Sequence, residues 1–252
     1  MGKTIRGEVF MRLILIVFSV VVIGLLGLGT FAENYNVHSP NECVSNINME
    51  EKILFIVDLS NSMNDYMGDR TKIDIAVNAL ANITSRLNPK IKTGLRVYGH
   101  KFGFNPIFGC KASELVLPLR ENNTANINSA LSRMSAVGWT PITKSLKDAV
   151  NFDFAGVVGQ KRIILLTDGG ETCDESPCDY AIKLIQTRDD IKIDVIAFAI
   201  NDPDADAQLK CTAVTTSGKI YRANTAADLA NSLEQALNVT TDVQGTVIMK
   251  QH

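Results

Sequence analysis

The most constraining feature of this sequence is an apolar run that stops at an acidic residue. The residues from Ile53 to Val57 are all apolar and mostly branched, which is typical of a buried strand. Asp58 ends the run, and two hydroxyl side chains follow at Ser60 and Ser62. In open parallel α/β sheets, ligands bind at the carboxyl ends of strands. If the chain turns here, these oxygens converge, and we expect them to form half of a cation site.

Two later segments supply candidates for the other half of the site. Asp168 follows a second apolar run over residues 163–167. Thr140 lies in the segment Gly138-Trp-Thr-Pro141, where glycine permits unusual backbone angles and proline is suited to start the next helix. We therefore expect the loop that carries Thr140 to be positioned as a unit.

The rest of the chain alternates apolar runs of strand length with segments of helical periodicity. Strands are expected at 53–57, 94–98, 114–117, 162–167, 193–199 and 219–222. Helices are expected at 72–87, 125–134, 142–152, 177–187, 205–216 and 226–238. We expect Pro118 to end the third strand at the sheet edge. The pattern predicts a doubly wound α/β domain with a mostly parallel sheet of about six strands and helices on both faces.

The first 32 residues differ from the rest of the chain. Lys3, Arg6 and Arg12 precede an apolar run at 13–31, which is the pattern of an export signal. The end of the run resembles a small-residue cleavage site, but the run is also long enough to span a bilayer. Residues 1–32 are thus expected to be either a cleaved signal peptide or an N-terminal membrane anchor. In both cases the remainder is exported to the periplasm, the cell surface or the medium.

Residues 33–49 lack apolar periodicity and are interpreted as a linker, followed by a domain at 50–240 and a tail at 241–252 with a strand-like segment. All five cysteines lie in the exported part, which favours disulfides: Cys43, Cys110, Cys173, Cys178 and Cys211. The four in the domain permit three pairings, and Cys43 in the linker is left over. A structural zinc site is disfavoured because no Cys-x-x-Cys pair or nearby histidine accompanies them.

The charge of the chain gives no sign of a nucleic-acid partner. The formal net charge is -2, and no long block of like charge occurs. The bulk electrostatics therefore do not predict binding to nucleic acid or a polybasic contact with membranes.

The segments Asp58-Leu-Ser60-Asn-Ser62, Thr140 and Thr167-Asp168-Gly169 together resemble the metal-ion-dependent adhesion site of von Willebrand factor type A domains. The resemblance covers roughly residues 50–240. Val97-Tyr-Gly-His100 and Leu166-Thr-Asp-Gly-Gly-Glu-Thr-Cys173 are similar to a bacterial exported subgroup, the calcium-activated chloride channel-like proteins. Asn61 stands where the family usually has glycine, and we expect it to tolerate a left-handed turn.

The candidate ligands offer only oxygen, which suits Mg²⁺, with Mn²⁺ and Ca²⁺ as competing metals. They are Asp58, Ser60, Ser62, Thr140 and Asp168. The resemblance implies a non-catalytic module in which a partner protein's Asp or Glu completes the coordination. Such a module serves adhesion or, alternatively, docking within a membrane-bound assembly. The plainest alternative has no metal, with the serines capping a turn that Asp58 holds.

Two enzyme or cofactor classes fit less well. A haloacid dehalogenase-type hydrolase needs a second aspartate two residues after the first, and Ser60 occupies that position. A dinucleotide-binding domain needs a glycine-rich turn after the first strand, and the segment 58–63 has no glycine. For His100 we expect a structural hydrogen bond, and for Glu171 and Asp174 a solvated acidic loop.

Overall fold

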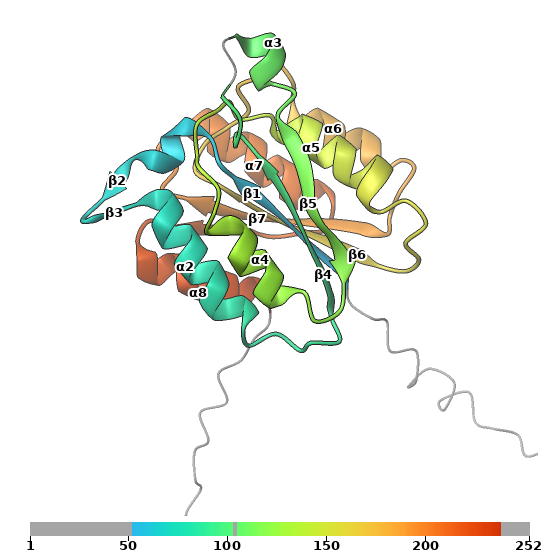
Figure 1. Cartoon of the computed structure of the whole chain (residues 1–252). Helices are drawn as coiled ribbons and strands as arrows, with labels where there is room; N and C mark the ends of the chain where they lie inside the picture. Colours follow the sequence, from blue (N-terminus) through green and yellow to red (C-terminus); the bar gives the residue numbers. More distant parts are fainter. Residues whose placement is uncertain (1–51, 103–104, 238–252) are drawn as a thin grey trace, which may run out of the picture. The chain divides into compact units, whose positions relative to one another are not determined.

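The computed structural model describes residues 52–102 and 105–237. A six-stranded sheet forms its centre, with strand order β5-β4-β1-β6-β7-β8 (Figure 1). The strands are β1 (Lys52–Asp58), β4 (Lys92–Tyr98), β5 (Ser113–Arg120), β6 (Lys161–Thr167), β7 (Ile191–Phe198) and β8 (Ile220–Ala223). All neighbours pair in parallel except β4 and β5, which are antiparallel. This confirms the predicted doubly wound α/β fold.

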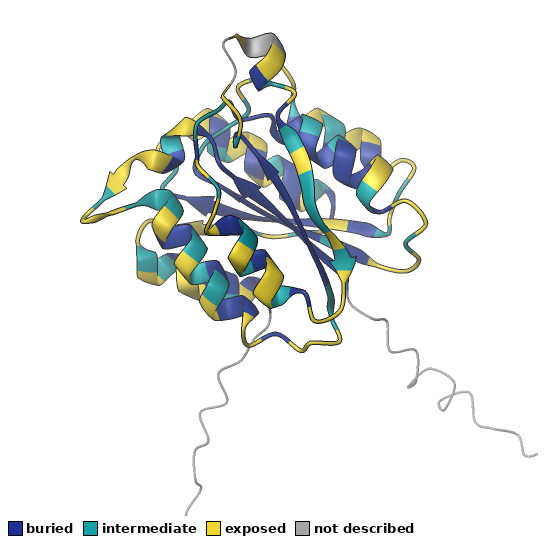
Figure 2. Cartoon of the chain, in the orientation of Figure 1, coloured by how far each residue is buried: buried dark blue, intermediate teal, exposed yellow. Residues whose placement is uncertain are grey.

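Helices cover both faces of the sheet (Figure 1). One face packs against α2 (Lys72–Thr84), α4 (Thr124–Leu131) and α8 (Ala226–Leu237). The other packs against α5 (Ile142–Asp148), α6 (Pro177–Leu184) and α7 (Pro203–Thr215). Figure 2 shows the inner strands buried between these layers, with exposed residues on the outer helix surfaces and on the edge strand β5.

The first strand shows why the sheet needs two helical layers. Ile53, Phe55 and Val57 belong to the core under α2, α4 and α8. Leu54 and Ile56 belong to the core under α5, α6 and α7. Successive side chains of a strand point to opposite faces, so an unbroken apolar run must be covered on both.

Several short elements were not predicted. A 3₁₀ helix, η1 (Asn61–Asn64), follows β1, and a small hairpin, β2 (Tyr66–Met67) and β3 (Arg70–Thr71), leads into α2. A single-turn helix, α3 (Pro106–Gly109), lies between β4 and β5. Elements of two to four residues are too short to show a hydrophobic period.

The strand β5 continues past Pro118 to Arg120, so the prediction that the proline ends it is wrong. β5 is the last strand on its side of the sheet. A proline is tolerated in such a strand because one of its edges has no neighbour to receive an N–H donor.

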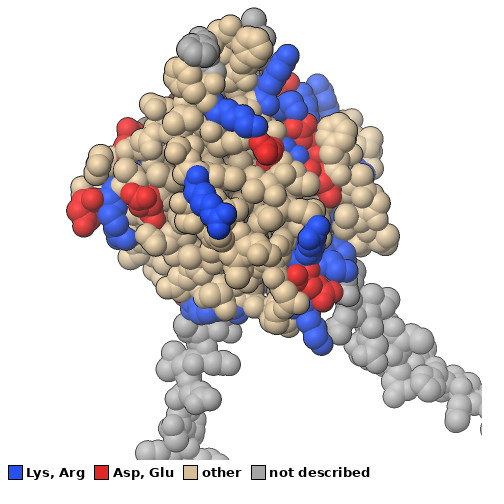
Figure 3. All heavy atoms as spheres, viewed as in Figure 1, with Lys and Arg blue, Asp and Glu red and all other residues tan. Residues whose placement is uncertain are grey.

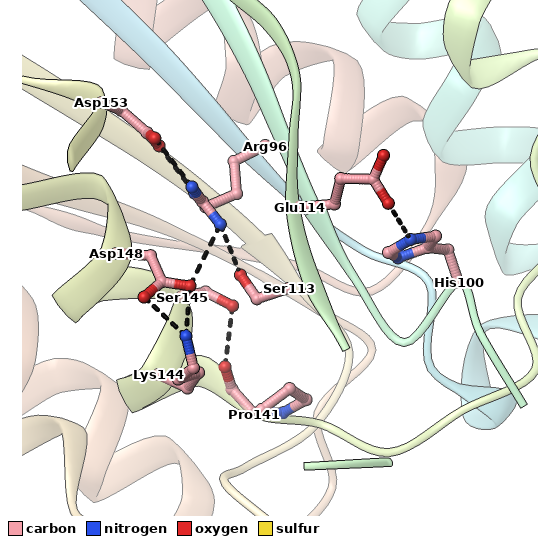
Figure 4. Close-up of polar contacts among 9 residues, drawn as sticks. All are labelled: Arg96, His100, Ser113, Glu114, Pro141, Lys144, Ser145, Asp148 and Asp153. Atoms are coloured by element: carbon pink, nitrogen blue, oxygen red, sulfur yellow. Dashed lines mark hydrogen bonds and ion pairs between the residues drawn. The ribbon is translucent and has the colours of Figure 1, made fainter. Parts of the chain in front are cut away.

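The expected helix at 142–152 begins as predicted but changes its geometry after Asp148. The turn η2 (Ala149–Asp153) is a π-helix, in which the Phe154 N–H donates to the Ala149 carbonyl at 2.9 Å. Residues five apart lie one turn apart in this geometry, so Asp148 and Asp153 face the same side. Both bind the buried Arg96 of β4, with Nε to Asp153 at 2.6 Å and Nη1 to Asp148 at 3.4 Å (Figure 4).

The predicted export segment, linker and tail lie outside the described residues. Among the helices of the described part, none has the length and apolar character needed to cross a bilayer.

Candidate metal centre

The turn after β1 places three of the candidate side chains. Asp58 is fully buried at the end of the strand, and its Oδ1 accepts the Ser60 N–H at 2.7 Å. The 3₁₀ helix η1 then brings Ser62 back, so that its Oγ lies 3.1 Å from the Oγ of Ser60. Asn61 is not among the described residues with a positive φ. The left-handed conformation that Asn61 was expected to tolerate is not used, because the helical turn reverses the chain without it.

Asp168 joins this group from β6, which is the parallel neighbour of β1. The Ser62 hydroxyl donates to Asp168 Oδ1 at 2.7 Å. The other carboxylate oxygen accepts the ammonium of Lys72, the first residue of α2, at 2.8 Å. Both partners of this ion pair are largely buried, with side chains 14% and 0% exposed. The Lys72 contact was not predicted, and its only signal in the sequence is a basic residue at the start of a helix.

Asp58 is hydrogen-bonded through both oxygens, yet the charged form of its buried carboxyl remains unfavourable. The Thr167 hydroxyl donates to its Oδ2 at 2.7 Å. Burial raises the pKa of the Asp58 carboxyl from 3.8 to about 6, the negative charge of Asp168 adds to this, and the bonds from Ser60 and Thr167 oppose it. Because the charge of Asp168 disfavours the charged form of Asp58, a cation between the two carboxylates would be favoured.

Close packing of glycines brings the Thr140 loop to the β1 turn. A Cβ at Gly138 would meet the Lys101 carbonyl oxygen at 2.7 Å, and one at Gly99 would meet the Ser60 nitrogen at 2.5 Å. Gly138 accepts the Asn61 N–H at 3.0 Å and pairs with Ser60 in a parallel bridge. Gly138 does not have a positive φ, so it is required for close approach and not for unusual backbone angles. These contacts hold the Thr140 loop against the β1 turn.

The loop after β6 holds Thr140 from the other side. The Thr140 N–H donates to the Thr172 hydroxyl at 2.9 Å, and the Thr172 N–H donates to the Thr140 carbonyl at 3.2 Å. Glu171 accepts the N–H of Thr143 at 2.7 Å and that of Cys173 at 2.9 Å. Burial raises the pKa of Glu171, and these N–H donors oppose that shift. The expectation of a solvated loop is therefore wrong for Glu171, whose carboxylate ties the loop to the start of α5, and right for the exposed Asp174.

Two disulfides resolve the pairing that the sequence left open. Cys110 is bonded to Cys173, and Cys178 to Cys211. The first bond joins the segment after α3 to the loop after Asp168, and so braces the rim of the candidate site. Cys43 lies outside the described residues.

His100 has the structural role that we expected. Its Nε2 lies 3.0 Å from Glu114 on β5 (Figure 4), and the same carboxylate accepts Lys101. Burial lowers the pKa of His100, so the neutral imidazole is favoured. Among the described residues no nucleophile is hydrogen-bonded to this ring.

The donor set of this cluster suits a hard divalent cation. The structure gathers Asp58, Ser60, Ser62 and Asp168 through direct hydrogen bonds, and Thr140 lines the same cavity as the two serines. All five offer oxygen, the ligand atom that Mg²⁺, Mn²⁺ and Ca²⁺ prefer. Within residues 52–102 and 105–237, no group of three or more His, Cys, Asp or Glu side chains could hold a metal. A zinc-type cluster is therefore absent from the described part, and a site here depends on the hydroxyls.

This arrangement of a doubly wound sheet with an oxygen cluster at its carboxyl edge defines a known class of domain. The family model of the von Willebrand factor type A domain matches residues 52–236. The chain therefore belongs to the von Willebrand factor type A domain family.

The chain is also similar to individual proteins and solved structures. The protein YwmD of Bacillus subtilis (strain 168), itself uncharacterized, is 29% identical over 198 residues, which are 77% of this chain and 88% of YwmD. A von Willebrand factor type A structure from Catenulispora acidiphila has a TM-score of 0.60 at 22% identity, covering 75% of this chain and 42% of that one. Proximal thread matrix protein 1 from the mussel byssus, solved with a zinc-occupied MIDAS motif, has a TM-score of 0.58 at 19% identity and covers 75% of this chain and 45% of its own.

Proposed function

We propose that this chain is an exported, non-catalytic protein-binding module that recognises an acidic residue of its partner through a divalent cation. The residues that would hold the cation are Asp58, Ser60, Ser62, Thr140 and Asp168. When bound, the cation supplies a positive centre that can take an Asp or Glu carboxylate. Mg²⁺ is the metal we favour, with Mn²⁺ and Ca²⁺ as competitors.

One observation carries this proposal. Side chains from two loops far apart in sequence meet at the carboxyl edge of the sheet, where Ser62 contacts both Ser60 and Asp168, and Thr140 of a third loop lines the same cavity as the serines. A merely structural turn would not need a second, buried carboxylate from β6. Asp58, with its pKa raised by burial and by Asp168, would gain from a bound cation. Family membership and the zinc-occupied MIDAS motif of the mussel protein point the same way.

The ligand residues have distinct tasks in this proposal. The Asp58 and Asp168 carboxylates supply negative charge at the ends of β1 and β6. The neutral hydroxyls of Ser60, Ser62 and Thr140 supply oxygen without cancelling the charge of the cation. The site therefore keeps an affinity for a further carboxylate, which the partner provides.

Three further features support the module's location and the kind of partner. The two disulfides of the described domain are typical of an oxidising compartment, in line with an export signal or anchor at residues 1–32. Basic and acidic side chains are interspersed on the face shown in Figure 3. Such a surface favours a polypeptide partner over nucleic acid.

The test is calorimetric titration of the full chain with Mg²⁺ and with Mn²⁺. We expect one site, which Asp58→Ala abolishes and Asp69→Ala retains, because Asp69 is an exposed carboxylate in the β2–β3 turn. Capture of proteins from native membranes, with and without a chelator, then tests for the partner. Equal metal binding by Asp58→Ala, or a captured set that the chelator leaves unchanged, would overturn the proposal.

A further inference from the structure

A cavity at the proposed metal centre has both polar and apolar residues in its lining. Its volume is about 330 Å³, and it is lined by the oxygen-bearing Ser60, Ser62 and Thr140 together with Phe102 and Trp139. Oxygen side chains and aromatic rings thus line the same cavity. This volume is at the lower end of the range for ligand pockets, and it suits a side chain better than a large cofactor.

The aromatic residues of this lining are exposed to solvent. Trp139 is 36% exposed and Phe102 is 68% exposed. Single exposed apolar residues are common, but two aromatic side chains lining one cavity next to a candidate ligand site are characteristic of recognition surfaces. The Trp139 ring is backed by main chain, since a Cβ at Gly109 would lie only 2.1 Å from it.

A disulfide and hydrogen bonds connect the segments around the cavity. The bond between Cys110 and Cys173 joins the residue after Gly109 to the loop after β6. Thr172, in that loop and also lining the cavity, exchanges hydrogen bonds with Thr140. The support behind the Trp139 ring and the Thr140 backbone are therefore both linked to the loop after β6. A pocket held in this way avoids part of the ordering cost of binding.

We propose that this cavity is a specificity pocket for a large apolar side chain, aromatic or long aliphatic, that lies within two residues of the partner's acidic residue. The inference rests on the proposed function, because the acidic residue is the one that the cation takes. The short separation follows from geometry. Residues two apart in an extended strand point to the same side about 7 Å apart, so one segment can place both side chains in a single cavity.

Charge around the cavity agrees with an acidic segment as its occupant. Lys101 precedes Phe102, and Lys111 follows Cys110, and both lysines are exposed. Lys101 also pairs with Glu114, so the basic contribution at this rim is partial. An occupant with a carboxylate beside an apolar group agrees with exposed lysines next to Phe102 and Cys110 in the sequence.

The test is selection of a random peptide library displayed on phage against the immobilised full chain in Mg²⁺, with elution by EDTA. We expect the eluted sequences to contain Asp or Glu with a large apolar residue within two positions. A synthetic peptide of this kind should bind about tenfold more tightly than its apolar-to-Ala version, a typical effect for an anchor in a pocket.

Variants test the pocket and the metal centre independently. Phe102→Ala and Trp139→Ala should retain Mg²⁺ binding by calorimetry and still select acidic peptides, but without the apolar preference. Phe152→Ala removes a similarly exposed phenylalanine, on η2 and outside the cavity lining, and should select as the parent does. Phe102 is exposed enough for its truncation to leave the fold intact, should Trp139→Ala misfold.

The outcomes are distinct. Acidic peptides without an apolar preference in the parent, or an unchanged preference in both cavity variants, would overturn the pocket and leave the proposed function standing. Peptides without acidic enrichment would overturn both.

Discussion

Asp58→Asn should stabilise the metal-free protein at neutral pH while abolishing its response to Mg²⁺. Burial, and then the charge of Asp168, raise the pKa of Asp58 from 3.8 to about 6 in the folded chain. That difference corresponds to about 3 kcal/mol by which the charged form opposes folding above about pH 6. Asn keeps an oxygen for the Ser60 N–H, and its amide can donate to the Thr167 hydroxyl. The gain should therefore approach about 3 kcal/mol.

Through Asp58, the stability of the metal-free protein should fall as pH rises. Because the pKa of Asp58 is higher in the folded chain than in the unfolded one, its protonation favours folding. That stability is fully present below about pH 3.8 and is lost as pH rises through about 6. In a chelator, the parent should lose stability between about pH 4 and pH 7.5 through this group, whereas Asp58→Asn should show no such loss.

Urea denaturation in EDTA, with and without replacement by Mg²⁺, measures both effects. A cation at about 100 times its dissociation constant should stabilise the parent by about 2.7 kcal/mol and leave the variant unchanged. Asp153→Asn is a matched control, since its carboxylate is also buried but binds Arg96 at 2.6 and 2.7 Å. Losing that charge should destabilise by about 3 to 5 kcal/mol. If Asp58→Asn destabilised the metal-free protein as Asp153→Asn does, the electrostatic reasoning would be refuted.

Three further predictions concern the surroundings of the site. Lys72→Met removes the ammonium that binds Asp168 at 2.8 Å, and should strengthen Mg²⁺ binding about tenfold in calorimetry, since like charges no longer repel. Glu171→Ala leaves two N–H groups without their acceptor and should lower the free energy of unfolding in urea by about 1 to 2 kcal/mol. Replacing Cys110 and Cys173 by Ser opens a link across 63 residues and should cost about 2 to 4 kcal/mol in the same assay.

Matched variants control for these effects. Lys101→Met, with a more exposed lysine that pairs with Glu114, should leave Mg²⁺ affinity unchanged. Glu175→Ala changes an exposed carboxylate of the same loop and should cost less than about 1 kcal/mol. Opening Cys178–Cys211 should lower stability but spare acidic-peptide binding, which opening Cys110–Cys173 should weaken. Each prediction would be contradicted if the variant and its control changed the measured quantity equally. That quantity is Mg²⁺ affinity for the lysines, stability for the glutamates and acidic-peptide binding for the disulfides.

The main elements could be predicted because local signals determine them. The run from Ile53 to Val57 must be buried on both faces, and Asp58 and Asp168 follow such runs directly, so topology alone brings the two carboxylates to one edge. Thr140 was a candidate because it lies in a loop between Gly138 and Pro141, just before α5, and the family resemblance supported that choice. The structure adds a reason for glycine at position 138, because a side chain there would meet the backbone of Lys101.

The parts that were missed depend on contacts distant in sequence. The π-turn η2 places Asp153 against Arg96, which lies 57 residues away in the sequence. No periodicity within residues 142–152 reveals that partner. The disulfide pairing depends on which loops meet at the rim. Phe102 has no signal of its own, because an aromatic residue after a strand is more often part of a core.

Anomalous diffraction from crystals of the full chain grown with Mn²⁺ tests the central claim most directly. We predict one strong peak within coordination distance of oxygen atoms of Ser60 and Ser62, with Asp58, Thr140 and Asp168 surrounding it and their contacts made directly or through water. The Lys72 ammonium should withdraw from Asp168 in that structure or remain on the oxygen that faces away from the metal. No peak at these residues at saturating Mn²⁺, or a peak held by other side chains, would contradict the account.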